Sequence, residues 1–213
     1  ATKKVFLTVN KANQTATFPA TAPPSSAVYN TSFTFAQPTS TSGNTVTITA
    51  SDCTLSGLTA TMTSGTTACT LTTTANGNTN YNALNATRTV TASKASQTIT
   101  FPAIGSKTVG DADFTPSATG GASGNAVTFT DSPSSVCTIV SGKVHLVAAG
   151  TCTVTASQSG DVNYNAAASV DRLFTVNSSD KTLTVTAPTN GSVSGTGISC
   201  GTDCTESYAV GTT

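Results

Sequence analysis

Residues 94–102 read Lys-Ala-Ser-Gln-Thr-Ile-Thr-Phe-Pro, and residues 11–19 read Lys-Ala-Asn-Gln-Thr-Ala-Thr-Phe-Pro. These two stretches lie 94 − 11 = 83 residues apart. The stretches 77–83 (Gly-Asn-Thr-Asn-Tyr-Asn-Ala) and 160–166 (Gly-Asp-Val-Asn-Tyr-Asn-Ala) are again 160 − 77 = 83 residues apart. Self-similarity at a fixed period indicates tandem copies of one structural unit. The sequence therefore predicts two repeats, over residues 11–93 and 94–177.

Each repeat contains short segments in which apolar and polar residues alternate, separated by Gly and Asn turns. Val144 and Leu146 alternate with Lys143 and His145, so the two apolar side chains should share one face of a strand. Several short strands at regular spacing are typical of a β-sandwich. In the second repeat we expect strands near 97–101, 113–118, 126–130, 136–140, 143–147, 151–158 and 169–176, with turns at Gly120-Gly121, Ser141-Gly142, Ala149-Gly150 and Ser159-Gly160.

The composition narrows the class of protein. Charged residues make up 8% of the chain and the formal net charge is zero, which argues against a nucleic-acid partner, because such proteins need a basic surface. Apolar residues make up 37% and are spread along the chain, which favours a folded protein over a disordered one. No apolar run is long enough to predict a membrane span.

The six cysteines form three local pairs: Cys53 with Cys69, Cys137 with Cys152, and Cys200 with Cys204. An even number of cysteines in a weakly charged, β-rich chain predicts disulfides and an oxidising compartment, although buried free thiols are the alternative. A Cys137–Cys152 bond would close a loop that contributes about 3 kcal/mol of stability. Each of these two cysteines opens a predicted strand, so we expect the bond to join neighbouring strands. We therefore predict a secreted or cell-surface protein.

The two ends of the chain differ from the repeats. Residues 3–9 place Val5, Leu7 and Val9 on one face, as in the closing strand of a preceding module, which we assign to residues 1–10. Residues 181–186 predict another strand, and Asn190-Gly191 predicts a hairpin turn. Residues 178–213 should form a partial β module that begins after the boundary at 178–180.

The second repeat resembles a known family. Its similarity to bacterial Ig-like repeats, which occur in tandem in large surface and secreted proteins, lies in Gln97–Phe101, Gly150–Gln158 and Asn163–Ala167. The first repeat departs from the pattern with Thr72-Thr73-Thr74, where the second has Thr155-Ala156-Ser157. The resemblance covers about residues 11–177 and implies tandem Ig-like β-sandwich domains without catalytic residues.

Residues 181–213 resemble the opening of the divergent internalin-type B-repeat of bacterial extracellular proteins. The matching stretches are Leu183–Val185, Gly191–Val193 and Cys200–Cys204, followed by Tyr208. This resemblance implies an all-β C-terminal module and likewise brings no catalytic residues.

The residue inventory predicts that the protein is not an enzyme and binds no cofactor. His145 is the single histidine, and we expect its strand position to face solvent. The chain has no nucleophile-elbow motif and no four-ligand zinc spacing. The aspartates could supply oxygen ligands for calcium, but they lack the spacing of a calcium loop, and we expect turn residues that bond their own backbone. They are Asp111, Asp113, Asp131 and Asp161.

Tyr81 and Tyr164 occupy equivalent positions in the two repeats. They could form sugar-stacking platforms, but recurrence inside a variable surface favours structural tyrosines that pack a turn, with the hydroxyl bonded to the backbone.

We expect a structural segment of a bacterial extracellular protein, such as a stalk, spacer or fibre. Its partners would be neighbouring repeats or other copies of the chain, and filaments could form if the strand 3–9 of one copy completed the 181–213 module of the next. The alternative is an adhesive or carbohydrate-binding module that recognises surface glycans. A cluster of exposed Tyr or Phe side chains on one face would distinguish the second function from the first.

Overall fold

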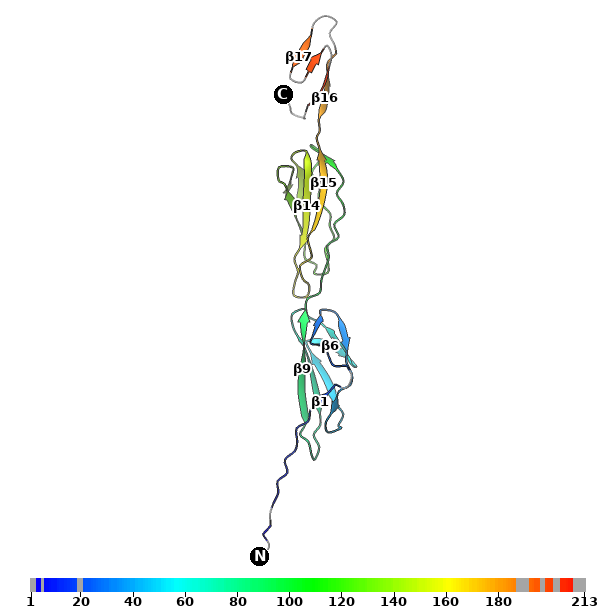
Figure 1. The fold of residues 1–213 in the computed structure, drawn as a ribbon, viewed down its shortest axis with the longest axis vertical. Helices are drawn as coiled ribbons and strands as arrows, with labels where there is room; N and C mark the ends of the chain where they lie inside the picture. Colours follow the sequence, from blue (N-terminus) through cyan, green and yellow to red (C-terminus); the bar gives the residue numbers. More distant parts are fainter. Residues whose placement is uncertain are drawn as a thin grey trace. The chain divides into compact units, whose positions relative to one another are not determined.

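The computed structural model describes residues 3–4, 6–18, 21–186, 192–195 and 204–208, together with the backbone of 198–200. Every regular element among these residues is a β-strand, which confirms the predicted all-β class (Figure 1). The chain divides into two compact units. The first comprises Ala1–Thr98, Gly121–Asn125 and Ser159–Ala167, and the second comprises Ile99–Gly120, Ala126–Gln158 and Ala168–Thr213.

The first sandwich has two main sheets. One has the strand order β2 (Ser26–Val28), β9 (Leu84–Ser93), β8 (Cys69–Ala75) and β5 (Thr47–Ser51). The other has the order β3 (Ser32–Thr34), β7 (Thr59–Met62) and β6 (Cys53–Ser56), and β1 (Ala16–Thr17) pairs with β4 (Thr39–Ser40) beside them. The buried cluster that fills the sandwich contains Phe35, Ala60, Met62, Cys69, Leu71 and Val90.

The second sandwich repeats this arrangement. Its large sheet has the order β10 (Lys107–Thr108), β15 (Val170–Asn177), β14 (Gly150–Gln158) and β11 (Val127–Ser132). The hairpin of β12 (Cys137–Val140) and β13 (Lys143–Leu146) forms the other sheet. In both sandwiches the first strand of the large sheet pairs with the last strand in parallel, and the remaining pairs of that sheet are antiparallel.

Alternation correctly predicted which side chains face the second core. Val144 and Leu146 are buried while Lys143 and His145 are exposed. In β14, Cys152, Val154 and Ala156 are fully buried.

Two of the strands expected in the second repeat are wrong. Residues 97–101 and 113–118 each contribute a single bridge, Thr100 to Thr119 and Phe114 to Val144. Pro102 and Pro116 lie in or beside these segments, and proline lacks the N–H group that would extend a ladder. The short strand β10, which carries no alternation signal, was not expected.

Beyond the two sandwiches, the described residues form short strands or none. The described residues between Lys3 and Asn10 form no strand. Near the other end, β16 (Lys181–Thr184) pairs with β19 (Thr205–Tyr208), and β17 (Val193–Gly195) pairs with β18 (Ile198–Cys200). Val5 and the predicted turn at Asn190-Gly191 lie outside the described residues.

Candidate interaction surfaces

A buried glutamine at the start of each repeat holds a loop at one end of the sandwich. The Gln97 amide nitrogen donates to the carbonyls of Ser159 (3.2 Å) and Asn165 (2.8 Å), and its oxygen accepts from the Ser123 backbone N–H (2.9 Å). Gln14 donates to the carbonyls of Asn76 and Asn82 in the same way, and its oxygen accepts a bond from the Ser42 hydroxyl. Both glutamines are over nine-tenths buried, so the loops are anchored by a shielded amide.

The loop that Gln97 holds is built around an aspartate. The Asp161 carboxylate accepts from the backbone N–H groups of Asn163 and Tyr164, and the Asp161 N–H donates to the Tyr164 carbonyl. Asn78 makes the same three bonds to Asn80 and Tyr81 in the first repeat. Residues 76–82 and 159–165 therefore have the same local structure.

A glycine in each loop allows a close approach of the backbone. A Cβ atom built on Gly160 would lie 2.2 Å from the Tyr164 carbonyl oxygen, and one on Gly77 would lie 2.8 Å from that of Tyr81. Both distances are shorter than real contacts allow, so each position needs glycine.

Tyr164 and Asn163 carry contacts within the first compact unit. The Tyr164 ring packs edge-on against Tyr29, with centroids 5.4 Å apart and planes at 80°. The Asn163 side-chain oxygen accepts a hydrogen bond from the Gly65 backbone N–H at 3.0 Å. We call Tyr29 and Gly65 the socket, because together they receive the 159–165 loop.

Both predicted turn tyrosines are half-buried, and their backbone groups make the turn's hydrogen bonds. Sequence reasoning missed Gln14, Gln97 and the socket. A signal for the glutamines exists in the repeated stretch itself, because Gln97, Ile99 and Phe101 occupy every second position and all three are buried.

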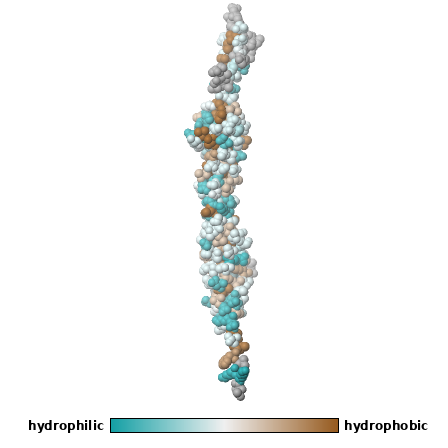
Figure 2. Space-filling view, turned by 90° about the vertical axis from the view of Figure 1, so that its left-hand side faces the viewer, coloured by the Kyte–Doolittle hydropathy of each residue, from teal (hydrophilic) through white to brown (hydrophobic). Residues whose placement is uncertain are grey.

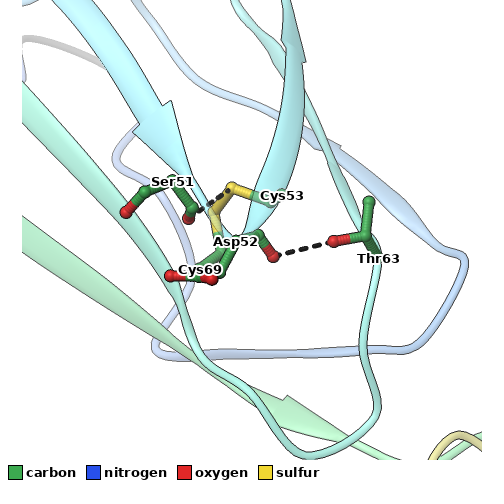
Figure 3. The surroundings of a disulfide bond; sticks show 5 residues. All are labelled: Ser51, Asp52, Cys53, Thr63 and Cys69. Carbon is green, nitrogen blue, oxygen red and sulfur yellow. Dashed lines mark hydrogen bonds between the residues drawn. A yellow bond between two sulfur atoms is a disulfide. The ribbon is translucent and has the colours of Figure 1, made fainter.

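The structure joins Cys53 to Cys69 and Cys137 to Cys152. Figure 3 shows the first bond beside Asp52, whose carbonyl accepts from the Thr63 hydroxyl at 2.8 Å. In each case the bond joins strands of two different sheets, with Cα atoms 5.2 and 5.9 Å apart. The expectation that Cys137 and Cys152 join neighbouring strands is therefore wrong: the bond crosses the core.

Cys204 is also disulfide-bonded. The side chain of Cys200, its predicted partner, lies outside the described residues. Disulfides persist in oxidising compartments outside the cytosol, so the two cross-core bonds mark the chain as extracellular or secreted.

His145 lies on the exposed face of β13, where its Nδ1 atom is 2.8 Å from the Asp113 carboxylate. The two side chains are 53% and 41% exposed, and such a surface pair contributes at most about 1 kcal/mol. Asp111 accepts from the Thr108 N–H, and Asp131 accepts from the Ile139 N–H. Among the described residues, no three potential ligand side chains gather into a metal-binding group.

Most of the surface in Figure 2 is white or teal, with brown confined to small patches. Among the large hydrophobic side chains in the described residues, Phe6, Leu7 and Val9 have the highest exposed fractions, at 89%, 86% and 83%. Of the aromatic side chains in the described residues, Phe6 is the exposed one, and the others are buried or half-buried. The described part of the chain contains no helix long and apolar enough to cross a membrane.

No protein-family model and no curated protein matches the chain. Neither resemblance noted in the sequence thus receives support from a family match. Solved structures with a similar arrangement include Drosophila N-cadherin EC1-4 (TM-score 0.31, 15% identity, covering 82% of this chain and 53% of that one). The protocadherin gammaB7 EC3-6 cis-dimer gives a TM-score of 0.32 and 13% identity, covering 83% and 55%. The chain spans about half the length of these structures, and such low scores carry no argument about its function.

Proposed function

We propose that this chain is a structural segment of a bacterial extracellular or cell-surface protein, serving as a stalk or spacer without enzymatic activity. The observation that carries the proposal is where the aromatic side chains lie. Within the sandwiches they are turned into the cores and the anchored loops. The outer face of the first large sheet instead carries hydroxyl side chains, such as Thr49, Thr87 and Thr89.

A ligand-binding module needs groups that converge on a ligand in a concave site. A spacer needs only a folded body and a soluble surface. The cross-core disulfides in both sandwiches also suit a segment that must stay folded outside the cell.

The test is to display the full chain between a surface anchor and an epitope tag. A spacer predicts that a second copy of the chain lets a larger probe reach the tag. If reach is unchanged by the added copy, the spacer function is wrong.

The alternative, a carbohydrate-binding module, is tested with the purified chain on a glycan array. We expect the chain to bind no glycan more strongly than an unrelated control protein does on the same array. Binding that Tyr81→Ala or Tyr164→Ala abolishes, and that Thr98→Ala leaves intact, would establish the alternative instead.

A second candidate function, assembly of copies into filaments, is favoured by the exposed side chains of Phe6, Leu7 and Val9. A segment with exposed apolar side chains can add as a strand to the sheet of another chain. Deleting residues 1–10 should abolish filaments in electron micrographs of the purified protein. Filaments of unchanged length and yield would exclude this mode of assembly.

A further inference from the structure

Loop 76–82 has the same local structure as loop 159–165. The second loop contacts the socket, whereas the described residues of the first sandwich offer loop 76–82 no equivalent of that socket. Asn80 and Tyr81 stand where the second loop has Asn163 and Tyr164. Those two residues meet the socket: Asn163 accepts from the Gly65 N–H, and Tyr164 packs on Tyr29. The Asn80 side chain is exposed, and Tyr81 is half-buried.

We propose that loop 76–82 is a docking surface for another Ig-like sandwich, one that carries an aromatic residue and a glycine at the positions of Tyr29 and Gly65. Asn80 would accept from the backbone N–H of that glycine, and the Tyr81 ring would pack edge-on against the aromatic residue. The partner is therefore defined by two features: an aromatic ring, and beside it a glycine whose backbone N–H is not covered by a side chain.

The glycine in the socket is a strict requirement. A Cβ atom on Gly65 would lie 2.8 Å from the Val162 carbonyl oxygen and 2.9 Å from the Asn163 Cα atom. Loop 76–82 has the same backbone shape, so it would meet the same obstruction in any sandwich that has a larger residue there.

This requirement excludes the second sandwich of another copy as the partner. Cys69 and Cys152 lie 152 − 69 = 83 residues apart, and the same offset places Ala148 at the position of Gly65. The Tyr29 N–H donates to the Ser93 carbonyl, and the Val109 N–H donates to the Asn177 carbonyl at the equivalent place in the second sandwich. Val109 therefore occupies the position of Tyr29 there, and it is not aromatic. A sandwich of the first type is therefore the fitting partner.

Residues 3–10 show how such a sandwich would lead into the loop. Leu7 and Val9 precede Val90 and Ala92 by 83 residues (90 − 7 and 92 − 9), and the latter two pack in the first core. Strand β9 runs on to Ala95, which pairs with Tyr164, just as residues 3–10 run on to Ala12, which pairs with Tyr81. A closing strand at 3–10 would thus place its own sandwich next to loop 76–82.

The test uses an extended chain in which residues 11–93 are placed directly before Lys11 of residues 11–213. The added copy then presents a second Gly65 amide, and hydrogen exchange followed by NMR distinguishes it from the resident one. We expect the added amide to be protected to within about threefold of the resident amide, since both would donate one neutral hydrogen bond of ordinary strength.

The Asn80→Ala variant, made in the copy that precedes Lys94, should speed exchange of the added Gly65 amide by about fivefold to tenfold, the factor that such a bond provides. Asn163→Ala should do the same to the resident amide alone, and Thr79→Ala is the matched neighbour that should change neither. A Gly65→Ala substitution in the added copy should remove the ring contact of Tyr81, seen as loss of its ring-current shifts.

The resident Gly65 amide reports in the same sample that the extended chain has folded. If it is protected while the added amide exchanges freely, loop 76–82 does not dock and the proposal is wrong. Protection of the added amide that is insensitive to Asn80→Ala overturns it as well.

Discussion

The Gln97 amide is a buried polar group that ties two loops to the start of the second repeat. It is 8% exposed and makes three hydrogen bonds to backbone groups from two separate loops. A buried backbone group that loses its partner costs about 1–3 kcal/mol. Removing the Gln97 amide would therefore break three hydrogen bonds to backbone groups and lower the free energy of unfolding.

We expect Gln97→Leu to lower the free energy of unfolding of the second sandwich by about 2 kcal/mol, since leucine keeps the volume and leaves the carbonyls unpaired. Urea unfolding followed by circular dichroism measures the change. The neighbouring exposed residue provides the control, and Thr98→Ala should stay within about 0.5 kcal/mol of the parent chain. A Gln97→Leu variant as stable as the parent would show that water replaces the amide.

Gly160→Ala should destabilise the 159–165 loop by about 1–3 kcal/mol, because the new methyl group overlaps backbone atoms that cannot move independently. A Cβ atom there would also lie 2.5 Å from the Asn165 carbonyl carbon. Thermal unfolding and exchange of the loop amides measure this effect. Gly105 has nothing within 4 Å of a built Cβ atom, so Gly105→Ala should leave stability unchanged, and equal effects at both sites would contradict the steric explanation.

At the scale of elements, strand β12 is held to the large sheet by a covalent bond. It pairs with β13, and the Ile139 N–H donates to the Asp131 carboxylate of β11, but its covalent tie is the bond from Cys137 to Cys152 of β14 across the core. Closing a loop of this length lowers the entropy of the unfolded chain, which stabilises the folded one.

Replacing Cys137 and Cys152 together by serine should therefore lower stability by about 3 kcal/mol. Differential scanning calorimetry measures the loss, and the parent chain under reducing conditions, which also break the Cys53–Cys69 bond, should lose at least as much. If the double variant had the same melting temperature as the oxidised parent, the disulfide would contribute nothing and the hydrogen-bonded sheets alone would fix the fold.

Strands with a buried and an exposed face could be predicted from the sequence. In β13 and β14 every second side chain is buried, so period-2 alternation located them. Strand β10 could not be found, because an element of two residues shows no alternation. The partner of Asn163 was equally hidden, since Gly65 lies 98 residues away and nothing local marks it.

At the scale of the whole molecule, each of the two sandwiches carries its own buried core and its own cross-core disulfide. Stability in repeat proteins is approximately a sum of terms within copies and between neighbours. Residues 11–94 and 94–178, produced separately, should therefore each fold with a β-type circular dichroism spectrum. If neither folds alone, the repeats form one obligate unit and the boundary at residues 93–94 is misplaced.

The parallel pairing of the first and last strands has a mechanical consequence. The Tyr29 N–H bonds to the Ser93 carbonyl at 2.8 Å, and the Thr91 N–H bonds to the Ser25 carbonyl at 2.9 Å. Tension on the two ends of the copy pulls β2 toward its amino end and β9 toward its carboxyl end. Because the strands are parallel, they are drawn past each other lengthwise, and their hydrogen bonds are loaded together instead of one after another. Strands β10 and β15 have the same geometry, so each copy should resist stretching with several bonds at once.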